Sequence, residues 1–223
     1  ALMDRNEDKH MALMTDGMFP MRRRIPPLAD FLRRLPRKGM LMADDSYGLG
    51  FLGKGGRGSL SGAGISDPRA VLTGSMAKAL GAGGGFIASS TGTIERIRRR
   101  AEVYMGTTPI SPAVAAGARA ALQILEAEPE RVRRWRAHAA RLTPLAERLG
   151  LEPGDGRGPV LPLPVEEARE GRRLEKQLAA EGLYIPWIEY GGGSGALRVA
   201  VSSEHTGKEL ERLEAVLLRV YEP

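Results

Sequence analysis

Four short runs of mostly apolar residues constrain the fold of this chain more than any other sequence feature. They cover Met11–Thr15, Met40–Ala43, Ala70–Thr73 and Gly85–Ala88. Turn-forming residues bound these runs, and helical patterns or loops separate most of them. Strands that are buried on both faces of a mostly parallel sheet show this pattern. The sequence therefore predicts an α/β fold.

A segment rich in Gly, Pro and charge, residues 150–158, predicts a domain boundary. Residues 1–149 then form a large α/β domain with linking helices, and residues 150–223 form a small C-terminal domain. The helices of the second half are expected at 112–127, 129–149, 165–181 and 206–221. Strands are expected at 160–163, 183–187 and 197–201, which makes the small domain α+β.

Composition excludes several classes of function. The 223 residues include no cysteine, so disulfides and thiolate metal sites are excluded, and the three histidines are too scattered for a metal-ligand pattern. The net charge of +6 comes mostly from arginines in helical patterns and does not indicate a nucleic-acid partner. No uncharged apolar run is long enough to cross a membrane, and the first nine residues lack an apolar signal core. A soluble cytoplasmic protein without a membrane partner is expected.

Lys78 is the most informative single residue. It is the only charged residue between Ala70 and Ile94, in a chain with 27 arginines and only six lysines. Its neighbours are small or apolar, and an apolar environment disfavours the charged ammonium form. A neutral lysine amine can attack a carbonyl and form a Schiff base. A lysine that merely extends into solvent from a Gly-rich loop fits the same pattern about equally well.

Four ordered stretches resemble the α-oxoamine synthases, which include 8-amino-7-oxononanoate synthase and 2-amino-3-ketobutyrate CoA ligase. This family belongs to the class I/II superfamily of pyridoxal 5'-phosphate (PLP)-dependent aminotransferases. The stretches resemble the family motifs T-[DE]-G-V-F-S-M…P-L, D-[ED]-[AS]-H-x-x-G-x-x-G-x-x-G-R-G, T-G-T-x-x-K-A-L-G…G-G-[FY] and L-R-[IV]…H-T. In this chain they lie at Thr15–Leu28, Asp44–Gly58, Thr73–Phe86 and Leu197–Thr206. One departure lies in the first stretch, where Met21–Arg24 stands in place of the acidic turn of the family pattern.

The resemblance implies a type I PLP-dependent transferase fold and a role for each matching residue. Lys78 would form the Schiff base with the cofactor and later move protons at the substrate Cα. Asp44 would pair with the protonated pyridine nitrogen, and Ser75 would contact the cofactor phosphate. Arg198 would bind the substrate carboxylate through its planar guanidinium.

The resemblance also implies partners. Thr107 or Thr108 matches a hydroxyl that reaches the phosphate of the neighbouring subunit, so a homodimer is expected. The implied reaction condenses an amino acid with an acyl-CoA and releases CO2. Tyr47 stands where the family has histidine, and the wider aminotransferases place a tyrosine there to donate to the cofactor's phenolic oxygen. An aminotransferase that uses a keto acid is therefore the closest alternative.

Two further alternatives stay open. Ser75 and Lys78 form an S-x-x-K pattern, which is typical of serine acyl-enzymes with Ser75 as the nucleophile. The S-D-N element of those enzymes has no counterpart, because Asn6 is the only asparagine. The other alternative is an inactive fragment, because the family carries a long N-terminal part ahead of the strand at Met11–Thr15. That part contains the ring-stacking side chain and a phosphate-binding helix start.

Overall fold

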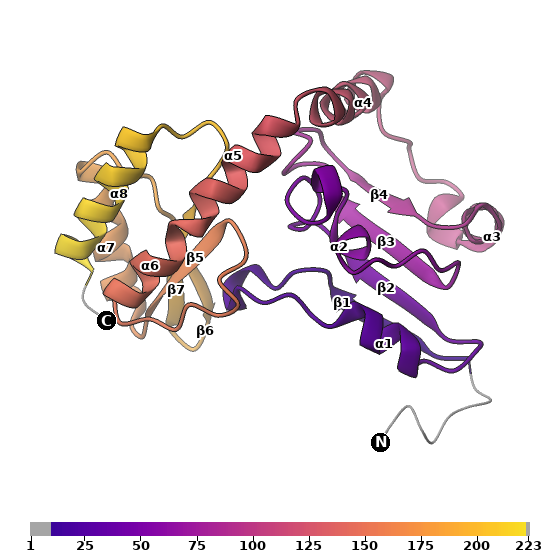
Figure 1. The fold of residues 1–223 in the computed structure, drawn as a ribbon, viewed down its shortest axis with the longest axis horizontal. Helices are drawn as coiled ribbons and strands as arrows, with labels where there is room; N and C mark the ends of the chain where they lie inside the picture. The colour runs from indigo at the N-terminus through magenta and orange to yellow at the C-terminus, as the bar shows by residue number, and fades with distance from the viewer. Residues whose placement is uncertain (1–9, 222–223) are drawn as a thin grey trace. The chain divides into compact units, whose positions relative to one another are not determined.

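The computed structural model describes residues 10–221, so the charged segment at residues 1–9 lies outside the description. The described chain forms two compact units (Figure 1). Unit 1 contains residues 10–18 and 25–132, and unit 2 contains residues 19–24 and 133–221. The division falls ahead of the boundary expected near residue 150, and it assigns the short segment Phe19–Arg24 to unit 2.

Unit 1 is built on a four-stranded sheet with the order β1-β2-β3-β4. The strands are β1 (Ala12–Asp16), β2 (Met40–Asp44), β3 (Ala70–Ser75) and β4 (Gly85–Ala88). β1, β2 and β3 are parallel, so Asp16, Asp44 and Thr73 lie side by side at or near their carboxyl ends. All four strands form where the apolar runs predicted them, and the α/β class is confirmed.

β4 differs from the simplest expectation because it runs antiparallel to β3. Only residues 76–84 connect the two strands, and a parallel crossover needs a dozen or more residues. Gly84 has a positive φ of 89° and reverses the chain, and the Met76 N–H donates to its carbonyl at 3.0 Å. The short Gly-rich connection thus determines the direction of β4.

Helices cover the sheet of unit 1 and supply its core. α1 (Leu28–Arg34) buries Leu28 and Leu32 against Leu41 and Ala43 of β2. α2 (Ser59–Gly62) and α3 (Thr91–Arg100) follow β2 and β4, respectively. α4 (Pro112–Ala127) packs Ala118 against Met76 and Leu80, which follow β3. The 3-10 turns are η1 (Pro20–Arg22, in unit 2), η2 (Lys54–Gly56) and η3 (Glu102–Tyr104).

Unit 2 is an antiparallel sheet of order β5-β7-β6 with helices packed on it. The strands are β5 (Val160–Val165), β6 (Trp187–Gly191) and β7 (Ser194–Ala200). The helices of this half of the chain are α5 (Pro129–Ala140), α6 (Leu142–Arg148), α7 (Ala168–Ala180) and α8 (Gly207–Val220).

Two predicted elements of this half differ in extent. The helix expected over 129–149 is divided into α5 and α6 at Arg141. The strand expected at 183–187 begins only at Trp187, because Leu183 instead closes the end of α7 by donating its N–H to the Leu178 carbonyl. A capping box of Thr206 and Glu209 starts α8, as the polar residues ahead of its apolar pattern suggest.

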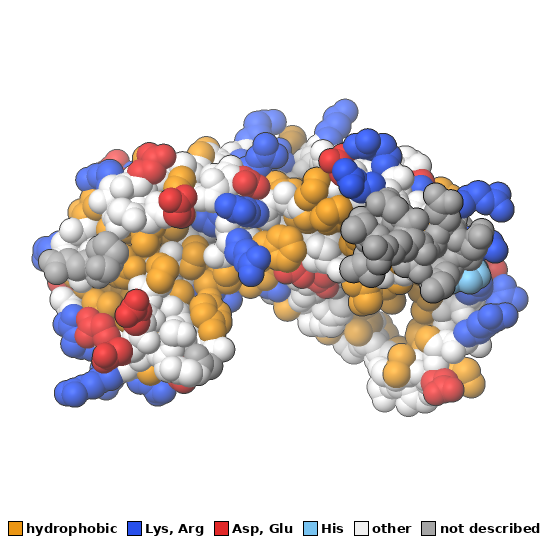
Figure 2. Space-filling model, turned by 90° about the horizontal axis from the view of Figure 1, so that it is seen from below, with side chains coloured by type: hydrophobic (Ala, Val, Ile, Leu, Met, Phe, Trp, Pro, Cys, Tyr) orange, Lys and Arg blue, Asp and Glu red, His pale blue; other side chains and the backbone are white. Residues whose placement is uncertain are grey.

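The surface carries charges of both signs. On the face shown in Figure 2, Lys and Arg side chains lie among Asp, Glu and hydrophobic side chains rather than in one continuous basic field. In the described part of the chain, none of the helices has the length and apolar character needed to cross a bilayer. The described residues also contain no cluster of three or more His, Asp or Glu side chains able to hold a metal ion.

Candidate functional site

The carboxyl ends of β2 and β3 bring together four of the predicted site residues. Asp44 and Ser75 are the last residues of these two strands, and Tyr47 and Lys78 lie in the turns that follow them. Open α/β sheets bind ligands at this edge, because the loops that leave the parallel strands converge there. The fold therefore explains why residues some 30 positions apart can share one site.

Hydrogen bonds from two neighbours orient the Asp44 carboxylate. Its Oδ1 accepts from the Ser46 N–H at 3.0 Å, and its Oδ2 accepts from the Thr73 hydroxyl at 3.3 Å. The register partners of Asp44 are Thr73 on β3 and Asp16 on β1. Burial, and secondarily the charge of Asp44, raise the pKa of Asp16. The Asp44 carboxylate is thus held in one direction at the strand end.

Ser46 and Ser75 tie the two strand ends together. The Ser46 hydroxyl accepts from the Ser75 N–H at 3.0 Å, and the Ser75 hydroxyl accepts from the Ala77 N–H at 3.1 Å. The second bond closes the turn that carries Lys78. These contacts fix the backbone between the end of β3 and the lysine, although the turn itself is solvent-accessible.

The Lys78 ammonium lies over the aromatic ring of Tyr47, 4.2 Å from the ring centroid. At this distance the ring quadrupole attracts the cation, which places the amine directly above Tyr47. The apolar enclosure expected for Lys78 is wrong, because Lys78 and Ala77 are exposed. Only Met76 and Leu80 on the same turn are buried, and they pack against α4 rather than around the amine.

The donor set fits the cofactor that the sequence motifs imply. The site offers an accessible amine, an oriented carboxylate, a phenol and a serine hydroxyl on two adjacent strand ends. PLP presents an aldehyde, a pyridine nitrogen, a phenolic oxygen and a phosphate, and each has a counterpart in this set. The residues of unit 1 are therefore chemically able to hold PLP.

The remaining predicted residues lie on other segments of the chain. Thr107 and Thr108 are exposed on the segment between η3 and α4, where the Thr107 hydroxyl donates back to the Val103 carbonyl. We call Asp44, Tyr47, Ser75 and Lys78 the Asp44–Lys78 group. Among the described residues, neither threonine hydroxyl is hydrogen-bonded to this group. Arg198 belongs to unit 2, within β7, where its N–H donates to the Pro186 carbonyl at 3.0 Å.

Sequence reasoning missed three residues that shape the site. Ser46 and Thr73 donate hydrogen bonds to the Asp44 carboxylate. Both residues lie inside the motif stretches, close to Asp44 and Ser75 in sequence, and this position could have identified them. Asp45 is the third, with a completely buried side chain. Burial, opposed by hydrogen bonds from Ser59, raises the pKa of Asp45, and the charge of Asp44 raises it further. Its burial could not be inferred from the acidic pair Asp44-Asp45.

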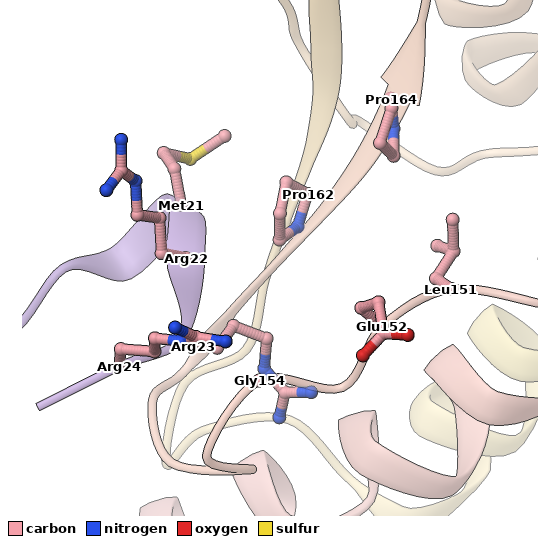
Figure 3. Close-up of a pocket in the computed structure, with 9 residues that line it drawn as sticks. All are labelled: Met21, Arg22, Arg23, Arg24, Leu151, Glu152, Gly154, Pro162 and Pro164. Carbon is pink, nitrogen blue, oxygen red and sulfur yellow. The ribbon is translucent and has the colours of Figure 1, made fainter.

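A pocket of about 350 Å³ lies entirely within unit 2 (Figure 3). Its lining includes the basic run Arg22–Arg24, where the family pattern has an acidic turn. Arg23 is buried, and its guanidinium donates to the Pro153 carbonyl and the Thr143 hydroxyl at 3.1 Å and to the Gly156 carbonyl at 3.4 Å. Burial lowers the pKa of Arg23. Arg23 therefore serves the packing of unit 2.

Comparisons with known proteins show which family the chain resembles. An 8-amino-7-oxononanoate synthase of Methylococcus capsulatus is 36% identical over 207 residues, which cover 90% of this chain and 53% of the relative. The enzyme of the same name from Thioalkalivibrio sulfidiphilus is 35% identical over 212 residues, 93% of this chain and 54% of the relative. The chain thus spans about half the length of these curated relatives. The resemblance to the α-oxoamine synthases is confirmed.

Solved structures show the same fold. A serine palmitoyltransferase from S. paucimobilis with a bound PLP–myriocin aldimine superposes with a TM-score of 0.87 at 21% identity, over 98% of this chain and 57% of that one. An 8-amino-7-oxononanoate synthase from Francisella tularensis gives 0.81 at 21% identity, over 98% and 64%. The expected type I transferase fold is confirmed. The profile of the family described as aminotransferase class I and II matches residues 15–217, and the chain therefore belongs to that family.

Proposed function

We propose that this chain carries the cofactor-binding lysine of a PLP-dependent transferase of the α-oxoamine synthase type. The observation that carries the proposal is the Lys78 amine lying 4.2 Å over the Tyr47 ring, in the turns that follow two adjacent parallel strands, of which β2 ends at Asp44. The 8-amino-7-oxononanoate synthases that share more than a third of its residues support this assignment. The reaction joins an amino acid to an acyl-CoA with loss of CO2.

Bound PLP supplies an electron sink for the charge that develops at the substrate Cα. Lys78 would attach the cofactor through its amine and, once the amino group of the substrate has replaced it, the freed amine would take up and return the proton at the substrate Cα. Asp44 holds a proton on the pyridine nitrogen with its carboxylate, which Ser46 and Thr73 keep oriented. A negative charge at that position stabilises the protonated nitrogen through the whole reaction.

The other proposed residues bind and orient. Tyr47 donates its hydroxyl proton to the cofactor's phenolic oxygen, and Ser75 contacts the phosphate. Arg198 binds the substrate carboxylate with two parallel N–H donors, which a lysine could not provide. Thr107 or Thr108 reaches the phosphate of a second subunit, so the functional form is a homodimer. Both threonines are exposed, as that role requires.

The attachment test uses borohydride reduction. The protein is incubated with PLP, reduced and digested, and the modified lysine is located by mass spectrometry. The protein is prepared in two forms: this chain alone, and this chain together with any coding sequence that continues in frame ahead of Ala1. We expect the label on Lys78 and its loss in Lys78→Ala. Lys54→Ala is the matched control, because Lys54 is exposed and lies outside the Asp44–Lys78 group. A wild-type protein without label on Lys78 would overturn the proposal.

The reaction test separates the two transferase classes. Tyr47, with a phenol where the synthases have an imidazole, favours an aminotransferase as the second candidate. Amino acids are supplied with either an acyl-CoA or a keto acid. Release of CoA supports the synthase. Amino transfer to the keto acid, without CoA release, would assign the chain to the aminotransferases instead.

The serine acyl-enzyme alternative is tested with a β-lactam. Ser75 ends a strand and Lys78 lies in a turn, so the two residues do not share one face of a helix. We expect no acylation of Ser75. Stable labelling of Ser75 that is lost in Ser75→Ala would support that alternative.

A further inference from the structure

Asp45 lies next to the cofactor-facing Asp44 and takes no part in the mechanism above. Its side chain has no exposed surface, and its Oδ2 accepts from the Ser59 N–H at 2.7 Å. Its backbone carbonyl accepts from the N–H groups of Gly48 and Leu49 at 3.0 and 2.9 Å. A buried carboxylate is costly unless it is hydrogen-bonded, and here only Oδ2 of the two carboxylate oxygens has a partner, so its position calls for an explanation.

Three glycines leave the space that this carboxylate occupies. A methyl group on Gly48 would lie 1.9 Å from Asp45 Oδ1, and one on Gly58 would lie 1.9 Å from Oδ2. A methyl group on Gly17, just after β1, would lie 2.4 Å from Oδ1. These separations are far inside van der Waals contact, so a side chain at any of the three positions would displace the carboxylate.

The contacts of Asp45 reach both ends of one segment. The Gly-rich stretch Gly48–Gly58 begins directly after Tyr47 and ends at Ser59, where α2 starts. The bond from the Gly48 N–H to the Asp45 carbonyl closes a turn with Ser46 and Tyr47 at its centre. The bond from the Ser59 N–H holds the far end. The main chain of Asp45 makes the turn bond, whereas its carboxylate makes the Ser59 bond and the close packing against Gly48. The carboxylate therefore restrains the backbone that carries the Tyr47 ring beneath Lys78.

We propose that Asp45 is a positioning residue, whose buried carboxylate packs against Gly48 at one end of the Gly48–Gly58 segment, accepts from the Ser59 N–H beyond the other end, and thereby holds the Tyr47 ring under the Lys78 amine. What the ring and the amine do rests on the proposed function. The anchoring itself concerns only the packing around Asp45, so it can be tested without cofactor.

The cofactor-free test measures the position of Lys78 relative to the ring. Exposed lysines are reductively methylated with a ¹³C label, and Lys78→Arg identifies the Lys78 resonance. A methylamine above the face of Tyr47 is shifted upfield by the ring current. We expect the shift in the wild type and in Asp45→Asn, which keeps an acceptor for Ser59 and nearly the same volume. We expect its loss in Asp45→Ala.

Two further variants separate positioning from stability. Gly48→Ala displaces the carboxylate without changing it, so it should also remove the shift if Asp45→Ala does not fold. Leu32→Ala is the matched control, because it opens a cavity in the core of α1 and leaves the Asp45 contacts intact. An upfield shift retained in both Asp45→Ala and Gly48→Ala would overturn the proposal. So would an equal loss of the shift in Leu32→Ala.

The cofactor-dependent test measures the dissociation constant for PLP. We expect Asp45→Ala to weaken binding by about tenfold or more, as the loss of an anchoring hydrogen bond to a charged group implies, while Asp45→Asn stays close to the wild type. Equal affinities for Asp45→Ala and the wild type would contradict the proposal. If the wild type binds no PLP, the proposed function fails, and the methyl resonance of Lys78 still decides whether Asp45 is an anchor.

Discussion

The buried side chain of Arg23 explains a sequence feature that the family motifs do not account for. The basic run at Arg22–Arg24 departs from the acidic turn of the related synthases, and the structure gives the middle arginine a packing role. Arg23 has the only positive φ of a non-glycine residue in the described chain, 48°, and its guanidinium bonds three acceptors of unit 2. A planar fork of donors suits this set of acceptors better than a single ammonium.

We therefore expect Arg23→Ala to lower the free energy of unfolding by about 3 kcal/mol or more, because bonds to a buried charge are lost and acceptors are left unpaired. Arg22→Ala, at the exposed neighbouring position, should change it by less than about 0.5 kcal/mol. Urea denaturation of both variants measures the difference. Similar effects of the two substitutions would show that the buried contacts contribute little.

Asp45 makes stability depend on pH. Burial, chiefly, raises its pKa in the folded protein above the ordinary value of about 3.9. Between those two values the folded state binds more protons than the unfolded state, so this group's contribution to stability falls as the pH rises through that window. Asp45→Asn has no such titration. The free energy of unfolding of Asp45→Asn, relative to that of the wild type, should therefore rise from about pH 4 upward and then level off.

Thermal unfolding of the wild type and Asp45→Asn over a pH series measures this trend. Asp67 serves as the comparison, because bonds from Arg69 lower its pKa and give the opposite sign. Stability from Asp67 is lost as the pH falls, so Asp67→Asn should lose its disadvantage at low pH. A stability difference between Asp45→Asn and the wild type that is constant over the series would contradict the expected titration.

Among the secondary-structure elements, close approach decides which glycines can change. Gly171 lies in α7 where the helix meets β6, and a methyl group there would lie 2.4 Å from the Trp187 ring. Gly117 lies in the middle of α4, where a methyl group would meet nothing within 4 Å. Both glycines lie in helix interiors, so the two substitutions differ in packing rather than in helix propensity.

Gly117→Ala should raise the free energy of unfolding by about 0.5–1 kcal/mol, because alanine loses less backbone freedom on folding. Gly171→Ala should lower it by about 1–3 kcal/mol, because the clash with Trp187 exceeds that gain. Chemical denaturation of the pair checks both signs. A stabilising Gly171→Ala would mean that the indole moves aside at little cost.

Elements were predicted best where the signal was local. The four apolar runs and the helices expected at 112–127 and 206–221 required only neighbouring residues, and all are present. The direction of β4 and the late start of β6 depend on the length of a connection and on one hydrogen bond of Leu183. Hydrophobic periodicity carries neither kind of information.

In the whole molecule, the motifs predicted which residues lie close together better than how exposed those residues are. Asp44, Tyr47, Ser75 and Lys78 meet because parallel strands place their carboxyl ends together, and that follows from the fold class. The exposure of Lys78 and the burial of Asp45 depend on which loops pack over the strand ends. For Asp45, the close approach of Gly17, Gly48 and Gly58 leaves the space for the carboxylate, and hydrophobic periodicity along the chain does not reveal such long-range packing.

The two units have separate cores, and this predicts separate responses to core substitutions. Leu32 lies in the core of unit 1 on α1, and Leu178, fully buried on α7, lies in unit 2. Leu32→Ala and Leu178→Ala should each cost about 2–5 kcal/mol. Leu32→Ala should lower amide hydrogen-exchange protection in β1 and β2 and spare β5 and β7, and Leu178→Ala should do the reverse. Leu122→Ala, at an exposed position on α4, should alter neither sheet. If both core variants lowered protection equally in both sheets, the chain would unfold as one cooperative unit, and the lysine site would depend on the stability of the C-terminal sheet.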